Sequence, residues 1–260
     1  MKQFIVDAFT DIVFKGNPAA VCLVEQPLTD EQMQLIAIEN NLSETAFVQA
    51  AADGNGFDLR WFTPGSEVDL CGHATLATAF VIFNECNFKE STIVFHTMSG
   101  DLFVNRVENG YEMTFPAYEL TEVPVTAAME AVLGVCPEEA YMGRDLLCVL
   151  PDESFVTDYE PKSEALLMLG GLLVHTTAAG SNGFDCVSRS FAPKLAILED
   201  PVCGSGHCYI FPYWAKKLGQ SKFVGYQASK RSGVVYGEVD GDTVKLTGQA
   251  VLFSKGEIFV

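Results

Sequence analysis

The sequence predicts an α+β protein made of two similar domains, each a strongly curved, mostly antiparallel sheet around a central helix. Two observations carry this prediction. The 260-residue chain repeats one order of motifs in its two halves. Each copy also holds a helical stretch, apolar on nearly every side in the first copy, that a sheet wrapped around it would cover. We place the first domain at residues 1–117, with a last strand at 250–260 completing it, and the second at 118–249.

The repeat is visible where two segments are aligned. Phe57–Pro64 and Phe184–Pro193 both read Phe-Asp, a short gap and then Arg-x-Phe-x-Pro. Each is followed by an acidic loop that ends in a Cys-Gly pair, at Cys71 in the first copy and, 132 residues later, at Cys203 in the second. Shared anchors in one order at nearly one offset indicate a tandem of two related domains.

Local patterns justify the elements of the first copy in order. Thr29 and Gln32 have the spacing of a capping box, which opens a helix to about Asn40. Gly72–Glu85 is the helix that is apolar nearly all round, and Thr92–Phe115 reads as a hairpin turning at Asn109-Gly110. The expected strands, which alternate or run apolar, are Lys2–Ala8, Ala19–Val24, Glu44–Ala51 and Phe57–Thr63.

The second copy follows the same plan. A helix is expected from Ser205 to about Leu218, with a kink at Pro212 because proline lacks the backbone N–H that a helix interior needs. A hairpin is expected to turn at Asp240-Gly241, a strong two-residue turn signal.

Charge and hydropathy exclude several classes of partner. A net charge of −18 argues against nucleic acid and an anionic membrane, since both need a basic footprint. The longest apolar runs are about ten residues, half of what a bilayer span needs, and Asp7 interrupts the N-terminal apolar stretch. We therefore expect a soluble, cytoplasmic protein. Residues 201–237 contain no acid, so this segment either steers a small carboxylate or is simply a solvated face.

Two cysteines stand apart because each precedes a glycine where a loop enters a helix. The free N–H groups and the positive end of such a helix form a cradle for an anion, and the same field lowers the pKa of a nearby thiol. We expect the two domains to face each other across a cleft that holds Cys71 and Cys203. One thiol on each face of an α-carbon suits racemisation or epimerisation. The alternative is that both cysteines simply pack.

Histidines close to these cysteines invite a metal interpretation, which the spacing does not support. Cys71-x-His73, and Cys203 with His207 and Cys208, lack the closely spaced ligand pairs of zinc sites. The run Cys203-Gly-Ser-Gly also lacks the Gly-Lys-Ser/Thr ending of a phosphate loop. We therefore predict no metal site.

Taken together, the motifs resemble the PhzF-like family of phenazine-biosynthesis proteins. The resemblance runs to Gln227–Arg231 and covers nearly the whole chain. It implies a diaminopimelate-epimerase-like fold, a homodimer and a cofactor-independent isomerase. The motifs that carry it are Gly16–Val21, Leu42–Val48, Arg60–Pro64, Glu67–Thr75 and Glu199–His207.

The resemblance also implies roles for individual residues. The family's best understood member shifts protons with a glutamate, and the matching position is Glu44. Its supporting catalytic groups match His73 and Asp200, although Asp200 has the alternative role of capping the following helix. The predicted substrate-binding residues are Asn17, Gly72, Gly204, Ser205 and Gly206.

This chain departs from the family at two positions. Cys203 stands where threonine is usual and Gly206 where alanine is usual, so that Cys71-Gly-His and Cys203-Gly-Ser-Gly resemble the catalytic motifs of proline racemases and diaminopimelate epimerases. We expect an isomerase of a small carboxylic or amino acid, with Glu44 as the preferred acid/base and the two thiols as the rival pair. A hydrolase or lyase at the same site, and a non-catalytic metabolite-binding protein, remain alternatives.

Overall fold

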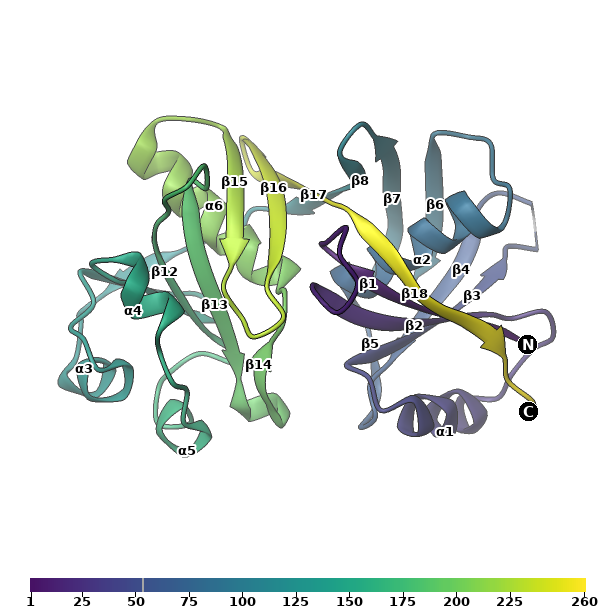
Figure 1. The fold of residues 1–260 in the computed structure, drawn as a ribbon, viewed down its shortest axis with the longest axis horizontal. Coiled ribbons are helices and arrows are strands. Elements are labelled where there is room, and N and C mark those ends of the chain that lie inside the picture. Colours follow the sequence, from purple (N-terminus) through teal and green to yellow (C-terminus); the bar gives the residue numbers. More distant parts are fainter. Residues whose placement is uncertain (53) are drawn as a thin grey trace. The chain divides into compact units, whose positions relative to one another are not determined.

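The computed structural model describes residues 1–52 and 54–260. The chain forms two compact units, one made of Met1–Thr114 with Thr247–Val260 and the other of Phe115–Leu246. Each unit combines strands with a long helix of its own (Figure 1). The α+β class predicted from the sequence is confirmed.

The first unit combines a curved set of strands with two helices. Its elements are β1 (Lys2–Ala8), β2 (Asn17–Leu23), α1 (Asp30–Asn40), β3 (Glu44–Ala50), β4 (Phe57–Phe62), β5 (Glu67–Val68), α2 (Gly72–Glu85), β6 (Thr92–Thr97), β7 (Gly100–Val107), β8 (Gly110–Pro116) and β18 (Ala250–Glu257). The segment expected as one hairpin over residues 92–115 is thus three strands, because Gly100 supplies a second turn with positive φ before the one at Gly110.

Strand pairing in this unit is mostly antiparallel, with two parallel exceptions. β18 pairs with β1, β1 with β2, β3 with β4, and β6 with β7 in antiparallel register. The pairs β2–β3 and β4–β6 are parallel. The helix between β2 and β3 is α1, and the helix between β4 and β6 is α2, so each parallel pair is joined by a helical crossover.

The two helices of this unit are covered to different degrees. On α2, ten residues are buried, and the helix packs against β1, β2, β3 and β18. On α1, Met33, Ile36 and Ala37 pack against Cys22, Phe47 and Phe62, while Leu35 and Ile38 stay exposed. The predicted capping box is present, with Thr29 accepting from the N–H of Gln32 and Gln32 accepting from that of Thr29.

The second unit repeats this plan with additional short helices. Its elements are β9 (Thr121–Val123), α3 (Ala127–Leu133), β10 (Glu139–Met142), β11 (Leu146–Val149), α4 (Glu153–Thr157), α5 (Ser163–Leu166), β12 (Val174–Ala179), β13 (Cys186–Ala192), a 3₁₀ turn (Pro193–Leu195), β14 (Ile197–Asp200), α6 (Gly204–Leu218), β15 (Lys222–Gln227), β16 (Gly233–Asp240) and β17 (Thr243–Gly248). The parallel pairs β11–β12 and β13–β15 stand where β2–β3 and β4–β6 stand in the first unit. The internal repeat of the sequence is therefore a repeat of strand pairing.

The long helix α6 accommodates a proline in its interior. Pro212 has no N–H to donate to the carbonyl of Cys208, four residues earlier. The backbone N–H of Tyr118 donates to that carbonyl instead, at 3.0 Å. Phe211, next to the proline, lies so close to β16 that a Cβ at Gly237 would approach its ring to 2.3 Å. Within residues 1–52 and 54–260, no helix has the length and apolar character needed to cross a bilayer.

Candidate active site

Three predicted site residues come together in the first unit. Glu44 is the first residue of β3, and His73 lies in the first turn of α2. Cys71 is the N-cap of α2, with φ −145° and ψ 108°. The Cys71 side chain makes no capping hydrogen bond to the helix. We call Glu44, Cys71 and His73 the unit-1 cluster.

His73 occupies the centre of the unit-1 cluster. Its Nε2 lies 3.1 Å from Oε2 of Glu44, and its Nδ1 lies 3.5 Å from Sγ of Cys71. The Glu44 and His73 side chains are only 15% and 8% exposed. Although close, Nε2 and Oε2 are not aligned as a hydrogen bond, and neither atom has an aligned partner among the described residues. Two buried polar atoms are thus left available to a ligand.

Charge in the unit-1 cluster is set by burial and by mutual proximity. Burial lowers the pKa of His73, but its contacts with Cys71 and Glu44 outweigh burial and raise the pKa well above 6.5. Burial raises the pKa of the Cys71 thiol, and the Glu44 carboxylate raises it further. The expectation of a lowered pKa for this thiol is therefore wrong, since its burial raises the pKa.

The donor atoms of the unit-1 cluster lie within 4.8 Å of one another, as metal ligands do. Their arrangement around the ring does not suit one ion, however. Cys71 faces Nδ1 of His73, whereas Glu44 faces Nε2. An ion bound at Nδ1 would therefore point away from Glu44, and an ion bound at Nε2 would point away from Cys71. We derive no metal-dependent step from these residues.

In the second unit, Cys203 is the N-cap of α6. Its Sγ accepts from the N–H of Gly206 at 3.4 Å and lies 3.4 Å from Oγ of Ser205. Burial raises the pKa of the Cys203 thiol well above 9.0, and the Asp200 carboxylate adds to the increase. The expected low thiol pKa is wrong here too. Because Cys203 is the cap, Asp200 does not cap α6.

The loop before α6 is held by a side chain that sequence reasoning missed. Gln227, buried at the end of β15, accepts from the N–H of Cys203 at 2.9 Å and donates to the carbonyl of Asp200 at 2.7 Å. One amide thereby fixes both ends of the turn that carries the thiol. The family motif that includes Gln227 was the only signal in the sequence.

The predicted substrate-binding residues lie at the starts of elements. Gly72 and Gly204 begin α2 and α6, and Ser205 lies in the first turn of α6. Asn17 begins β2 and is buried. Gly206 is required sterically, because a Cβ there would lie 2.8 Å from Cε1 of His175.

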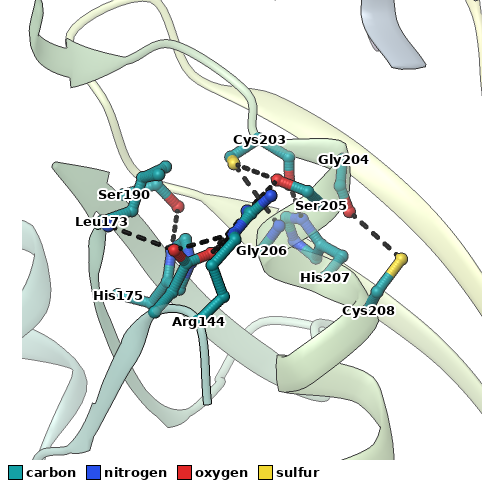
Figure 2. Close-up of polar contacts among 11 residues, drawn as sticks. Arg144, Leu173, His175, Ser190, Cys203, Gly204, Ser205, Gly206, His207 and Cys208 are labelled. Atoms are coloured by element: carbon teal, nitrogen blue, oxygen red, sulfur yellow. Dashed lines mark hydrogen bonds and ion pairs between the residues drawn. The ribbon is translucent and has the colours of Figure 1, made fainter. Parts of the chain in front are cut away.

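A second group of polar side chains in this unit was not predicted (Figure 2). We call His175, Ser190, Asp145 and Arg144 the unit-2 network. His175, in β12, lies 2.9 Å from Oγ of Ser190 through Nδ1 and 3.4 Å from the carboxylate of Asp145 through Nε2. Arg144 donates to the same carboxylate and reaches Oγ of Ser205 at 3.5 Å. The repeat offset applied to Glu44 points to His175, which is the one sequence signal for this network.

The acid-free segment 201–237 is partly neutralised by acids from outside it. Lys217 contacts Glu139 at 2.5 Å, and Lys222 lies 4.0 Å from Glu238. Both lysines are at least half exposed. These two cations are therefore largely a solvated surface, as the alternative interpretation held.

Comparison with known proteins shows which family the sequence matches. The family model for phenazine biosynthesis-like proteins (PhzC-PhzF) matches residues 6–256. An uncharacterized isomerase of Pseudomonas aeruginosa is 42% identical over 98% of this chain and 97% of its own length. An uncharacterized isomerase of Halalkalibacterium halodurans is 40% identical, covering 99% of this chain and 98% of its own.

Solved structures extend the likeness to the fold. A PhzF-family protein of Enterococcus faecalis superposes with a TM-score of 0.96 and 49% identity, over 100% of this chain and 99% of that one. A hydroxyproline epimerase of Agrobacterium vitis shares the fold at a TM-score of 0.63 and 10% identity, over 98% and 91%.

Fold and relatives define the class of protein first: this is an enzyme of the isomerase class with an epimerase-like fold. Within that class, the chain belongs to the phenazine biosynthesis-like PhzC-PhzF family.

Proposed function

We propose that this chain is a cofactor-independent isomerase of a small carboxylic or amino acid, in which Glu44 takes a proton from carbon and returns it. The single observation that carries the proposal is the pairing of Glu44 and His73, whose facing atoms are 3.1 Å apart, buried, and without aligned hydrogen bonds. A carboxylate left in this state accepts a proton from a bound substrate more readily than one already saturated with donors.

The proton transfer needs no further reactant. Glu44 removes the proton, the electron pair of the broken C–H bond becomes part of a conjugated system next to the substrate carboxylate, and the protonated Glu44, after exchange with solvent, returns a proton to carbon. His73, whose pKa is raised by its neighbours, stabilises the Glu44 carboxylate before the proton is taken and again after it is returned. Acid and base are thus one group acting twice.

A two-thiol route through Cys71 and Cys203 is the rival mechanism. It needs a thiolate near neutral pH, yet burial raises both thiol pKa values. Cys203 instead fits a structural role, because its Sγ caps the start of α6, and Cys71 holds the N-cap position of α2 without a side-chain capping bond. This difference in protonation favours Glu44 over the cysteines.

The starts of α2 and α6 supply donors for an anionic ligand. Gly72 and Gly204 carry no side chain, so backbone N–H groups there remain accessible at helix ends that favour negative charge. We assign Asn17, Ser205 and Gly206 to substrate binding in the same proposal, and Asp200 to binding a substrate amine. A homodimer and a cytoplasmic location belong to it as well; light scattering and cell fractionation test them.

The proposal is tested by incubating the protein in D2O with a panel of small carboxylic and amino acids. We expect at least one compound to lose its NMR signal at the carbon next to the carboxylate and to gain deuterium there. Release of a fragment or of ammonia without reversible exchange would instead identify a hydrolase or lyase. Saturable binding of panel compounds with no exchange would identify a metabolite-binding protein.

A further inference from the structure

A charged side chain outside the predicted site stands beside the first turn of α6. Nη2 of Arg144 lies 3.5 Å from Oγ of Ser205, and that hydroxyl lies 3.4 Å from Sγ of Cys203 (Figure 2). The Arg144 side chain is 49% exposed. Its Nη1 donates to no acceptor in the part of the chain that the structure describes. The guanidinium therefore has donors free for a ligand.

The orientation of Arg144 is fixed from behind by Asp145. Nε and Nη2 both donate to the Asp145 carboxylate, at 3.1 Å and 2.6 Å. The carboxylate is fully buried and also accepts from the N–H of Leu173 at 3.1 Å. A guanidinium held through two nitrogens cannot swing freely, so its remaining N–H groups keep one direction.

Asp145 is in turn held in place by a buried histidine. Nε2 of His175 lies 3.4 Å from the Asp145 carboxylate, and its Nδ1 lies 2.9 Å from Oγ of Ser190. All three side chains are fully buried. Room for this group is made by Gly206, where a Cβ would come within 3.2 Å of both His175 and Ser190.

Stability alone is a weak reason for such a network. Burying ionised groups carries a large desolvation penalty, and apolar replacements of similar volume are often neutral or stabilising. Here the buried groups converge on one exposed cation, Arg144, beside a hydroxyl and a helix start. Fixing the orientation of the Arg144 guanidinium is a reason for the network that stability does not provide.

We propose that Arg144 binds the carboxylate of a small-molecule ligand at the start of α6, and that Asp145, held by His175, is its positioning residue. This rests on the proposed function in that the ligand is taken to be the isomerase substrate. A guanidinium matches the planar, two-oxygen shape of a carboxylate, and Ser205 adds a hydroxyl donor beside it. Arg144 thus selects acids over their neutral amides.

The test is NMR of the protein with 15N-labelled arginine, titrated with acetate, with its neutral isostere acetamide, and with chloride at matched ionic strength. The chain has few arginines, and the Arg144 Nε signal is assigned by its loss in Arg144→Lys. We expect a saturable shift of this signal with acetate alone. Arg60 and Arg189, both bound to glutamates, are internal references that should stay in place.

Two variants separate binding from positioning. In Arg144→Lys, acetate affinity measured by the shifts of backbone N–H signals in the first turn of α6 should fall about tenfold, because a charge remains but the two-nitrogen contact is lost. In Asp145→Asn, the Arg144 signal should persist but broaden and lose its response to acetate. If Asp145→Asn does not fold, the Arg144→Lys comparison still decides.

An Arg144 signal that follows acetate no more than the Arg60 signal does, or that follows chloride equally, overturns the proposal. The measurement involves no turnover, so it fails or succeeds separately from the isomerase assay. Acetate binding at Arg144 without hydrogen exchange on any acid would keep this site and contradict the proposed function alone.

Discussion

Nε2 of His73 lies 3.1 Å from Oε2 of Glu44, at the meeting of a helix start and a strand start. The two residues are 29 positions apart in the chain, and the crossover from β3 to α2 brings them together. The pKa of His73 is raised by this neighbour and by Cys71 in spite of burial. A buried histidine with a raised pKa beside a glutamate is therefore the electrostatic core of the unit-1 cluster.

We expect the ring signals of His73 to titrate with a pKa above 6.5 in an NMR pH series. In Glu44→Gln, removal of the negative charge should lower this pKa. Because the pKa of His73 is higher in the folded state, protonation of His73 stabilises that state. This contribution to the free energy of unfolding is present below about pH 6.5 and is lost as the pH rises through the pKa of the folded state. A His73 pKa that is unchanged by Glu44→Gln contradicts this account.

The stability contribution of His207, on α6, depends on pH in the opposite direction. Its Nδ1 lies 2.7 Å from the carbonyl of Cys203 and must donate to it, since a carbonyl only accepts. Burial lowers the pKa of His207 to about 4. The unfolded chain therefore takes up the proton first, and stability should fall between about pH 6.5 and pH 4, by about 3 kcal/mol in total.

Urea unfolding at about pH 7 and about pH 4.5 measures this loss. His207→Asn is the matched variant, because its amide nitrogen replaces Nδ1 as donor to Cys203 but does not titrate. The variant should be less stable at neutral pH yet should lose less stability on acidification than the wild type. Equal losses in both proteins would show that His207 does not carry the effect.

Gly206→Ala should destabilise the protein by about 1–3 kcal/mol, because the added methyl group overpacks the site. Its Cβ would lie 2.8 Å from Cε1 of His175 and 2.9 Å from Nδ1. Gly204→Ala, two residues earlier on α6, is the control, since its Cβ meets only Leu246 at 3.9 Å and should change stability by less than about 1 kcal/mol. Thermal unfolding of both variants decides; equal effects would refute the steric reason.

The repeated arginines of the two units should differ in their contribution to stability. Arg189 is 8% exposed, bridges Glu199 through two nitrogens and donates to the carbonyl of Tyr159, so Arg189→Leu should cost about 3–5 kcal/mol. Arg60 is 35% exposed and pairs with Glu67, so Arg60→Leu should cost about 1 kcal/mol or less. Denaturant unfolding that ranks the two variants the other way contradicts this.

Much of the fold was predictable because it rests on local signals. The capping box at Thr29, the apolar helix Gly72–Glu85 and the turn at Gly110 are each written in neighbouring residues, and each is confirmed. The extra turn at Gly100 was missed because a single glycine between two apolar runs is a weaker signal than Asn-Gly.

Less of the site was predictable because it depends on distant pairings. Motifs brought forward Glu44 and His73, but the unit-2 network joins Asp145, in the turn before β11, to His175 in β12, 30 residues later. The thiol pKa values were predicted with the wrong sign, since the sequence shows the helix start at Cys203 but not the burial that raises the pKa of the thiol.

The most direct test of the central claim is the rate of deuterium incorporation next to the carboxylate of the exchanging acid, measured by NMR for Glu44→Gln and for Cys71→Ala/Cys203→Ala. We predict that Glu44→Gln loses about 10²–10⁴-fold in rate, while the double cysteine variant keeps exchange within about tenfold of the wild type. Retention of exchange in Glu44→Gln together with its loss in the cysteine variant would contradict the claim that Glu44 moves the proton.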